Sequence, residues 1–414
     1  MVEKDKGTPE TDEGRIHPVV KATGWVSFFT DLGSELIYPL LPEFLTVTLK
    51  VPKYMFGLIE GVAEGTPAIV KYFAGAISDR VRNRKWLIFA GYALSSLVKP
   101  FIGLTKYAAI ALAPFLVLAL RILDKIGKGV RGAPRDAVVA DFSEGKQGKS
   151  FGYQRAMDHA GAVAGGLVAF VLLRLAGLPI EWAIVLSIIP GVLSLFGIGF
   201  FVHDRPDRAV GVGRKEAGAT VGKPALPRAY YVYLVSAVLF TLANSSDGFL
   251  LIRAREMRLD IMYIPLVWAV LHVVKTITAY IGGTLSDRIG RKPVLFFGWL
   301  LYAVVYAGFS FLDGPAAVWA LFPIYGIFYG ATEGVAKAFV ADLIPSGSRG
   351  RAFGILGMVE GLLLIPTSIV VGLLWDRMGT GQVALAAEAG LALLAAIWLI
   401  IFVRAPGQSP AKTE

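Results

Sequence analysis

The sequence contains no cysteine, so it forms neither a disulfide nor a thiolate metal site and carries no cysteine nucleophile. Charged residues are also scarce. They make up 17% of the 414 residues, whereas 55% are hydrophobic and the mean hydropathy is +0.61. A soluble protein does not have this composition. The sequence therefore predicts an integral membrane protein.

Motifs that indicate an enzyme are missing as well. The sequence has no His-Glu-x-x-His and no Gly-x-Ser-x-Gly, and Gly127-Lys128-Gly129 lacks the upstream glycine and the following Ser or Thr of a P-loop. No closed set of metal ligands is visible either. We expect no enzymatic activity, no direct use of ATP, no cofactor and no bound metal.

The sequence is rich in long apolar runs. A membrane-spanning helix needs roughly 20 mostly apolar residues, and about twelve such runs follow one another here. We predict an all-α membrane protein with about twelve transmembrane helices in two pseudo-symmetric bundles of six. The expected spans are residues 19–48, 54–78, 86–106, 108–130, 151–177, 181–202, 229–252, 262–286, 293–312, 315–344, 352–375 and 381–403.

Basic residues account for the net charge of +10, and they gather in alternate connections, after the even-numbered spans. The positive-inside rule places these connections, and both termini, in the cytoplasm. The pattern predicts a multi-pass protein of the cell membrane that contacts anionic lipid rather than nucleic acid. Residues 1–18 are polar and lead into a full span, so we expect the first span to serve as its own insertion signal.

The longest polar connection divides the spans six and six, and the two halves share landmarks. Gly75-x-Ile-Ser-Asp79-Arg80 aligns with Gly283-x-Leu-Ser-Asp287-Arg288. The segment 138–152 aligns with 339–354, which sets Asp158 opposite Glu360. The expected organisation is an N-terminal tail (1–18), a first bundle (19–202), a linker (203–228), a second bundle (229–403) and a C-terminal tail (404–414).

These motifs, with twelve spans in two halves, resemble the major facilitator superfamily of transporters. The copy after the eighth span is close to complete, whereas the first copy has Arg82 where glycine is usual and Asn83 where a basic residue is usual. The resemblance implies that two halves rock about a central cavity lined by spans 1, 4, 7 and 10. It also implies that the acid of each motif meets a helix N-terminus and nearby arginines when the cytoplasmic side is shut.

A carboxylate at a helix N-terminus gains roughly 0.3 to 1 kcal/mol, which fits a latch that can open. The competing interpretation is that the motifs only fix topology, but the positive-inside rule does not require the paired acids. The predicted cytoplasmic gate consists of Gly75, Asp79, Arg80, Asp141, Gly283, Asp287, Arg288, Gly290, Arg291, Asp342 and Arg351.

Ionisable side chains inside the spans cost at least ~2.5 to 3.5 kcal/mol each, so by default they indicate function. The predicted substrate and proton-coupling residues are Asp31, Glu35, Glu64, Arg121, Asp158, Asp247 and Glu360. We interpret Glu60 and Lys71 as structural. The segment from Asp124 to Asp136 is interpreted as the cytoplasmic end of the fourth helix and a belt of salt bridges between the halves.

We therefore predict a proton-coupled secondary transporter that binds a small molecule or ion, lies in the bilayer and is monomeric. Four acids in the first two spans favour a cationic or amphiphilic solute, and Gly161-x-x-x-Gly165 partly matches an antiporter signature of the family, which favours export. Alternatives are an importer of an anionic metabolite or metal chelate, a metal-ion transporter, and a non-transporting sensor, scaffold or lipid scramblase.

Overall fold

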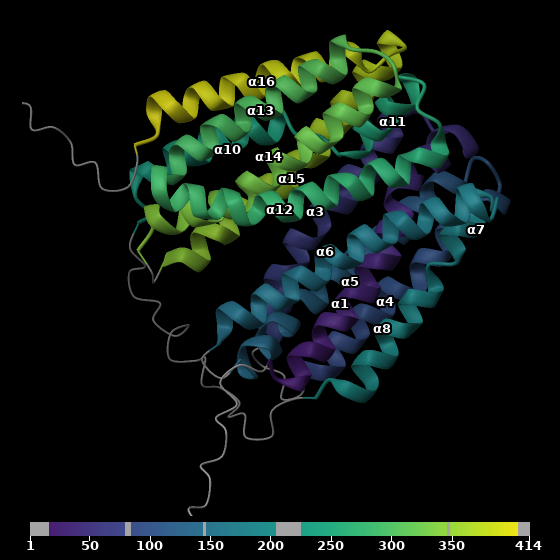
Figure 1. The fold of residues 1–414 in the computed structure, drawn as a ribbon, viewed down its shortest axis with the longest axis horizontal. Coiled ribbons are helices and arrows are strands. Elements are labelled where there is room, and N and C mark those ends of the chain that lie inside the picture. Colours follow the sequence, from purple (N-terminus) through teal and green to yellow (C-terminus); the bar gives the residue numbers. More distant parts are fainter. Residues whose placement is uncertain (1–15, 79–83, 144–145, 204–224, 346–347, 405–414) are drawn as a thin grey trace, which may run out of the picture.

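The computed structural model describes residues 16–78, 84–143, 146–203, 225–345 and 348–404. Within these ranges the chain is helical and has no strand, as predicted (Figure 1). Most of the expected linker falls outside them, since residues 204–224 are not described.

The first six spans are built from helices that carry several irregular ends. The 3-10 and π-helical turns are labelled η. The elements are α1 (Pro18–Ile37), η1 (Tyr38–Leu40), α2 (Leu41–Glu43), η2 (Phe44–Thr48), α3 (Lys53–Ser78), α4 (Arg84–Leu104), η3 (Thr105–Tyr107), α5 (Ala113–Asp141), α6 (Gln147–Phe170), η4 (Val171–Leu175), α7 (Ile180–Val185) and α8 (Ile188–Phe201).

The last six spans are more regular, except for the seventh, which is interrupted after Leu242. The elements are α10 (Arg228–Leu242), α11 (Gly248–Glu256), η5 (Ile261–Tyr263), α12 (Ile264–Ile289), α13 (Arg291–Phe311), α14 (Pro315–Leu343), α15 (Arg349–Met378) and α16 (Gln382–Phe402).

Eight of the described helices are long and apolar enough to cross a membrane. The other four expected spans correspond to the run from α1 to η2, to α3, to α5 and to the pair α10 and α11. The first three of these carry four of the predicted coupling residues, Asp31, Glu35, Glu64 and Arg121, and α10 is apolar but has only 15 residues. The spans that depart from ordinary hydropathy are therefore those that supply most of the charged interior.

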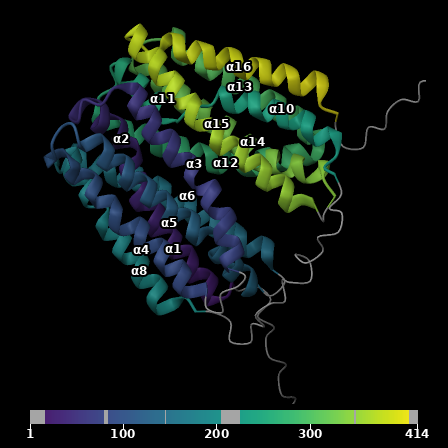
Figure 2. The ribbon, with the colours of Figure 1, turned by 180° about the vertical axis from the view of Figure 1, so that it is seen from behind.

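The helices form two groups, which Figures 1 and 2 show from opposite sides. In the first group α1 packs on α6 and α8, and α5 packs on α3 and α4. In the second, α14 packs on α12 and α13, and α16 packs on α10 and α13. The groups meet along two helix pairs, α3 with α15 and α6 with α12. Any site enclosed between the groups is bounded by these two contacts.

Glycines permit the closest of these contacts, between α3 and α15. A Cβ at Gly57 would collide with the backbone carbonyl of Ser368, and one at Gly65 would collide with the carbonyl of Gly361. Small residues let membrane helices approach this closely, because there is no side chain between the backbones. The contact therefore depends on glycine along one face of α3.

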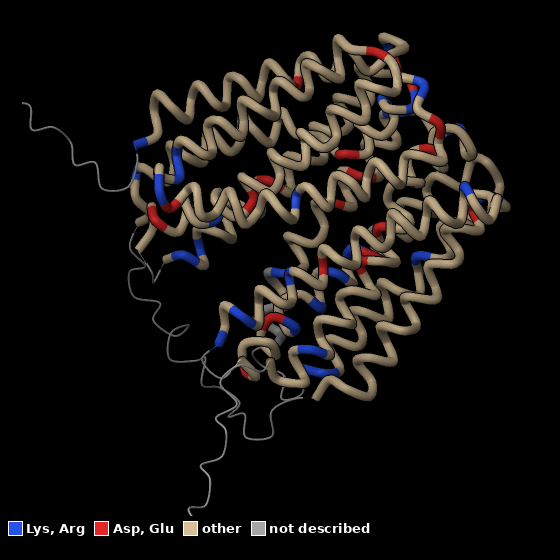
Figure 3. Tube along the Cα trace, in the orientation of Figure 1, with Lys and Arg blue, Asp and Glu red and all other residues tan. Residues whose placement is uncertain are grey.

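The two groups come together at one end of the molecule and diverge at the other (Figures 1 and 2). We call the diverging end, where α1, α4, α6, α10, α13 and α15 begin, the basic end, and the converging end, with α7 and α11, the opposite end. Figure 3 shows Lys and Arg at helix ends and a further set of charged residues in the interior between the groups. This interior set defines the candidate site.

Candidate transport cavity

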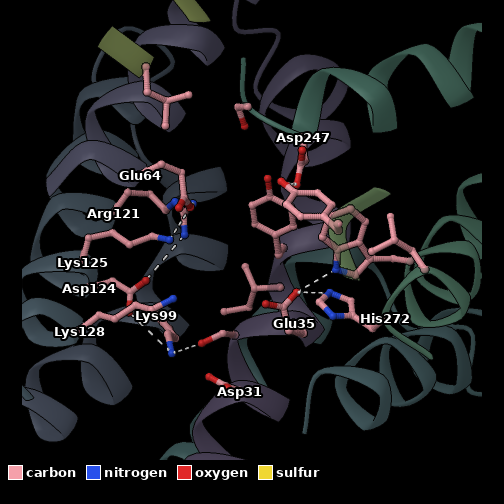
Figure 4. A pocket seen from close by; sticks show the side chains of 18 of the residues that line it. Asp31, Glu35, Glu64, Lys99, Arg121, Asp124, Lys125, Lys128, Asp247 and His272 are labelled. Carbon is pink, nitrogen blue, oxygen red and sulfur yellow. Dashed lines mark hydrogen bonds and ion pairs between the residues drawn. The ribbon is translucent and has the colours of Figure 1, made fainter. Parts of the chain in front are cut away.

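A cavity of about 340 Å³ lies between the two helix groups. The first group contributes side chains from α1, α3, α4 and α5, and the second contributes residues 244–247 and side chains from α12, α14 and α15 (Figure 4). The Asp, Glu, Lys and Arg residues that line it are Asp31, Glu35, Glu64, Asp124, Asp247, Lys99, Arg121, Lys125, Lys128, Arg131 and Lys275.

Five of the seven predicted coupling residues lie in this wall, namely Asp31, Glu35, Glu64, Arg121 and Asp247. The five come from three predicted cavity-lining spans and from the second span. The structure thus brings together residues that are up to 216 positions apart in the sequence, from 31 to 247.

Asp158 and Glu360 do not line the cavity. Asp158 lies on α6, where its carboxylate is 3.8 Å from the guanidinium of Arg135 and accepts a hydrogen bond from Gln154 at 3.3 Å. Glu360 lies on α15 and is exposed. Their proposed part in proton coupling stays a prediction.

A buried ion-pair network fills the wall on the first group's side. Arg121 donates from Nε to Glu60 Oε1 at 2.9 Å and from Nη2 to Glu60 Oε2 at 2.7 Å, a bidentate pair, and Glu60 is 1% exposed. Lys125 donates to Glu64 at 2.5 Å, and Asp124 lies 3.7 Å from Arg121. These charges neutralise one another, so Glu60 and Glu64 no longer favour a cationic solute.

The network also corrects the interpretation of the segment that follows Arg121. We expected the fourth span to end near residue 130, but α5 continues to Asp141. Asp124 and Lys125 therefore lie inside the helix and in the cavity wall, where they pair with residues of their own helix group. They do not form a belt between the halves at the basic end.

Three carboxylates in the cavity have no Lys or Arg within 4 Å among the described residues. Asp31 has no ion pair there. Glu35 accepts a hydrogen bond from Trp268 Nε1 at 2.8 Å and lies 3.7 Å from His272 Nε2. Asp247 accepts hydrogen bonds from Tyr325 at 2.7 Å and Tyr329 at 2.9 Å. Neutral donors hold Glu35 and Asp247 in place without cancelling their charge.

Two cations in the cavity also lack a carboxylate partner in the described part of the chain. The Arg131 guanidinium lies 4.1 Å from the ring centroid of Tyr92, and its buried Nη1 has no hydrogen-bond partner there. Lys128, three residues earlier on α5, lines the same cavity. Lys275, in contrast, pairs with Glu333 at 3.1 Å.

Lys99 is the functional candidate that the sequence analysis missed. It is 4% exposed in α4, its Nζ donates to Ser34 at 2.7 Å, and it lies 3.6 Å from Asp124. The signal was available, because a lysine near the middle of an apolar span obeys the same rule that selected Asp31.

The predicted gate residues form matched ion pairs within each helix group. Arg84 donates to Asp141 at 2.9 Å, and Arg291 lies 2.9 Å from Asp342. The next residues match too: Lys85 donates to the carbonyl of Gly199 at 2.7 Å and Lys292 to that of Ile400 at 2.9 Å. Arg84 is therefore the counterpart of Arg291, and the first motif carries one extra residue.

The other predicted gate residues make no ion pair among the described residues. Asp79 and Arg80 lie outside the described residues, and Gly75 is near the end of α3. Asp287 and Arg288 are in the last turn of α12, which Gly290 ends with a φ of 90°. A Cβ at Gly283 would meet nothing within 4 Å, whereas Gly282 packs on Ala331. Arg351 is exposed at the start of α15.

Among the described residues, an ion pair and two amide hydrogen bonds join the groups at the opposite end. Arg255 donates to both carboxylate oxygens of Glu43, at 3.0 and 3.2 Å. The amides of Lys53 and Tyr54, at the start of α3, donate to Asp376 at 3.1 and 2.9 Å. Between the cavity and the basic end, Arg155 and Glu333 form an exposed pair at 3.3 Å.

Comparison with known proteins gives consistent matches. The family model of the Major Facilitator Superfamily matches residues 23–365. An uncharacterized MFS-type transporter of Methanocaldococcus jannaschii is 33% identical, with 85% of this chain and 87% of that protein covered. Sugar efflux transporter A of Dickeya chrysanthemi is 24% identical, with 89% and 92% covered. A solved D-xylose-proton symporter has a TM-score of 0.77 at 14% identity, with 94% and 98% covered.

Proposed function

Because the chain belongs to the Major Facilitator Superfamily, it is a multi-pass membrane transporter and not an enzyme, and we propose that it exports a small polar solute in exchange for protons. The solute binds in the central cavity, and the two helix groups rock about it to expose it to one side of the membrane at a time. The predicted topology makes the basic end cytoplasmic.

The observation that carries the proposal is the set of three cavity carboxylates without a cation partner among the described residues, Asp31, Glu35 and Asp247. An acid in a poorly solvated site takes up either a proton or a positively charged group of the solute. Proton and solute then compete for the same carboxylates. Competition of this kind couples the two in opposite directions.

The charges that line the cavity limit the class of solute that it can bind. Eleven Asp, Glu, Lys and Arg side chains line about 340 Å³, so an amphiphilic solute would leave charged groups without solvent. We therefore keep the cationic solute and drop the amphiphilic one. Export is supported by a relative named for efflux, the sugar efflux transporter of Dickeya chrysanthemi.

One observation favours a second candidate, the import of an anion with protons. Arg131 is 6% exposed and its Nη1 has no partner among the described residues, and Lys128 lies one turn away on α5. A planar guanidinium suits a carboxylate or phosphate. Protonation of the nearby acids would then strengthen anion binding instead of opposing it, so proton and solute would move together.

Binding measured at two pH values separates the candidates. The purified full chain in detergent is melted at pH 6 and pH 8 with putrescine, xylose, succinate, inorganic phosphate or Mn²⁺. A probe at 100 times its dissociation constant adds roughly 2.7 kcal/mol to the stability of the folded state. Exchange of a cation predicts that putrescine stabilises more at pH 8, because protons compete for the acids at pH 6.

Matched variants assign the response to the cavity. Asp247→Asn should remove the putrescine response and its pH dependence, while Asp313→Asn, whose side chain is 69% exposed at the opposite end, should leave both unchanged. Stabilisation by succinate or phosphate that is larger at pH 6 and is lost in Arg131→Gln would establish the anion importer in place of the exporter.

A further inference from the structure

The charges of the central cavity that lack an ion-pair partner lie in two places. Asp247 precedes α11 and belongs to the wall of the second helix group, whereas Lys128 lies on α5 in the wall of the first. Figure 4 shows Asp247 across the cavity from Glu64, and Lys128 further along, nearer Asp31. Lys128 follows Arg121 by seven residues of α5, so it lies roughly 10 Å nearer the basic end.

The place near the basic end carries excess positive charge. Arg131 is 6% exposed, and its buried Nη1 has no hydrogen-bond partner among the described residues. A guanidinium does not lose its proton in a protein, so deprotonation cannot relieve this burial. Asp31 interacts electrostatically with both Arg131 and Lys128, and Glu64, which Lys125 already neutralises, interacts with Lys128. Two cations and one acid thus leave one positive charge without a counterpart.

The place beside the second helix group carries negative charge. Asp247 accepts hydrogen bonds from two tyrosine hydroxyls, and Glu35 accepts one from an indole of α12, so the donors are neutral. Lys275 interacts electrostatically with Asp247 but forms its ion pair with Glu333, at 3.1 Å. Two acids here therefore have no cation of their own in the described part of the chain.

We propose that the solute is a zwitterion, whose ammonium group binds at Asp247 and whose carboxylate binds at Arg131 and Lys128. This inference rests on the proposed function and adds an anionic group to its cationic solute. A solute with positive charge alone would leave the buried guanidinium without an anion. A carboxylate also suits the single excess positive charge better than a phosphate monoester, which carries a charge of about −1.5 to −2.

The charge count of the cavity agrees with exchange against a proton. The acids without an ion pair are Asp31, Glu35 and Asp247, and the cations without one are Lys128 and Arg131, so the five sum to one negative charge. One proton neutralises that charge, and a zwitterion adds no net charge of its own. The zwitterion contacts both helix groups at once, which a proton does not.

Thermal melting of the purified full chain at pH 7, in a non-ionic detergent, tests the charge of the solute. Titrations compare 6-aminohexanoate with hexylamine and hexanoate, and 4-aminobutanoate with butylamine and butanoate. We expect one of the zwitterions to bind at least tenfold more tightly than both of its analogues, which corresponds to ~1.4 kcal/mol for each charged end. Equal affinity of either analogue, or no saturable response to either zwitterion, would overturn the inference.

Variants locate the carboxylate. Arg131→Gln should abolish the advantage of the zwitterion over the amine and leave the affinity for the amine unchanged. Lys128→Gln removes an exposed side chain, should reduce the same advantage, and keeps the test valid where Arg131→Gln does not fold. Lys21→Gln, an exposed lysine of α1 that does not line the cavity, is the matched control. An advantage that persists in both cavity variants would refute the assignment.

The inference and the proposed function can fail separately, because binding at one pH does not depend on proton coupling. Preference for the zwitterion without any change in affinity between pH 6 and pH 8 would refute the exchange with protons alone. Amine binding that equals zwitterion binding and is stronger at pH 8 would refute the zwitterion alone.

Discussion

Arg121 is a cation that neutralises buried acids in the cavity wall formed by the first helix group. Its guanidinium donates two hydrogen bonds to Glu60 and lies 3.8 Å from Glu64 and 3.7 Å from Asp124. A fixed planar cation of this kind acts as a structural anchor, because its charge is already matched. The groups available to bind a solute are the cavity acids and cations that have no ion-pair partner among the described residues.

Removing Glu60 should be costly. In Glu60→Gln the buried Arg121 loses its bidentate partner, and loss of one member of a buried pair costs about 3 to 5 kcal/mol. Glu64→Gln is the matched comparison, since its side chain is 32% exposed and water replaces part of the interaction. Melting in detergent measures both. Equal Tm values for the two variants would show that the Arg121 pair is not an anchor.

Asp31→Asn should uncouple transport from protons. The amide keeps the shape of the side chain but takes up no proton, so ΔpH-driven efflux of a solute identified by melting should fall by at least tenfold in proteoliposomes. Exchange of labelled for unlabelled solute, which moves no net proton, should persist. Loss of both activities would indicate a binding or folding defect instead of uncoupling.

At the scale of elements, the contact of α3 with α15 depends on glycine. Alanine is the better helix former by about 1 kcal/mol, yet a Cβ at Gly57 collides with the backbone of Ser368. We predict that Gly57→Ala lowers stability by ~1 to 3 kcal/mol. Gly357→Ala, on α15, has open space and should be neutral or stabilising. Chemical or thermal unfolding of both variants checks this, and a stable Gly57→Ala variant would contradict it.

The element boundaries show what sequence patterns convey. Hydropathy located the twelfth span, predicted at 381–403 and found as Gln382–Phe402, because the run is apolar apart from Gln382, Glu388 and a glycine. It missed the break in the seventh span, although Asn244-Ser245-Ser246-Asp247 is a polar run that competes with helical hydrogen bonds. It also ended the fourth span too early, because charges there were taken as a helix end.

The sequence predicted some of the charged residues that line the candidate site, but not how they pair. Rarity of charge within membrane helices selected Asp31, Glu35, Glu64, Arg121 and Asp247. Which charges neutralise one another depends on how α3 and α5 are rotated toward each other, and spacing within one helix does not contain that information. The pairing of Arg121 with Glu60, and the absence of any such pair for Asp31 among the described residues, therefore required the structure.

For the whole molecule, contacts at the opposite end hold the two helix groups together. Glu43 and Arg255 form a bidentate pair between the groups, and Asp376 accepts two amide hydrogen bonds at the start of α3. At the basic end, the described pairs Arg84–Asp141 and Arg291–Asp342 each lie within one group, and the exposed Arg155–Glu333 pair joins the groups. We infer that the described state is closed at the opposite end.

Glu43→Gln should shift the population toward opening at that end. The chain has no native cysteine, so a single Leu251→Cys, 1% exposed, reports access there directly. Its labelling by a membrane-impermeant maleimide should become at least threefold faster in Glu43→Gln, while Leu312→Cys, already 49% exposed, should label equally in both backgrounds. Unchanged labelling of Leu251→Cys would refute the role of Glu43 as a latch.

Distance measurement between spin labels tests most directly whether cavity acids drive the rocking of the two halves. Labels at Gln147→Cys on α6 and Gly350→Cys on α15, both exposed at the basic end, report its opening in lipid nanodiscs. The account predicts two distance populations that exchange between pH 5 and pH 8, and a single pH-independent distribution in Asp31→Asn/Asp247→Asn. One unchanging distance in the unmodified background, or a pH response that survives both substitutions, would contradict it.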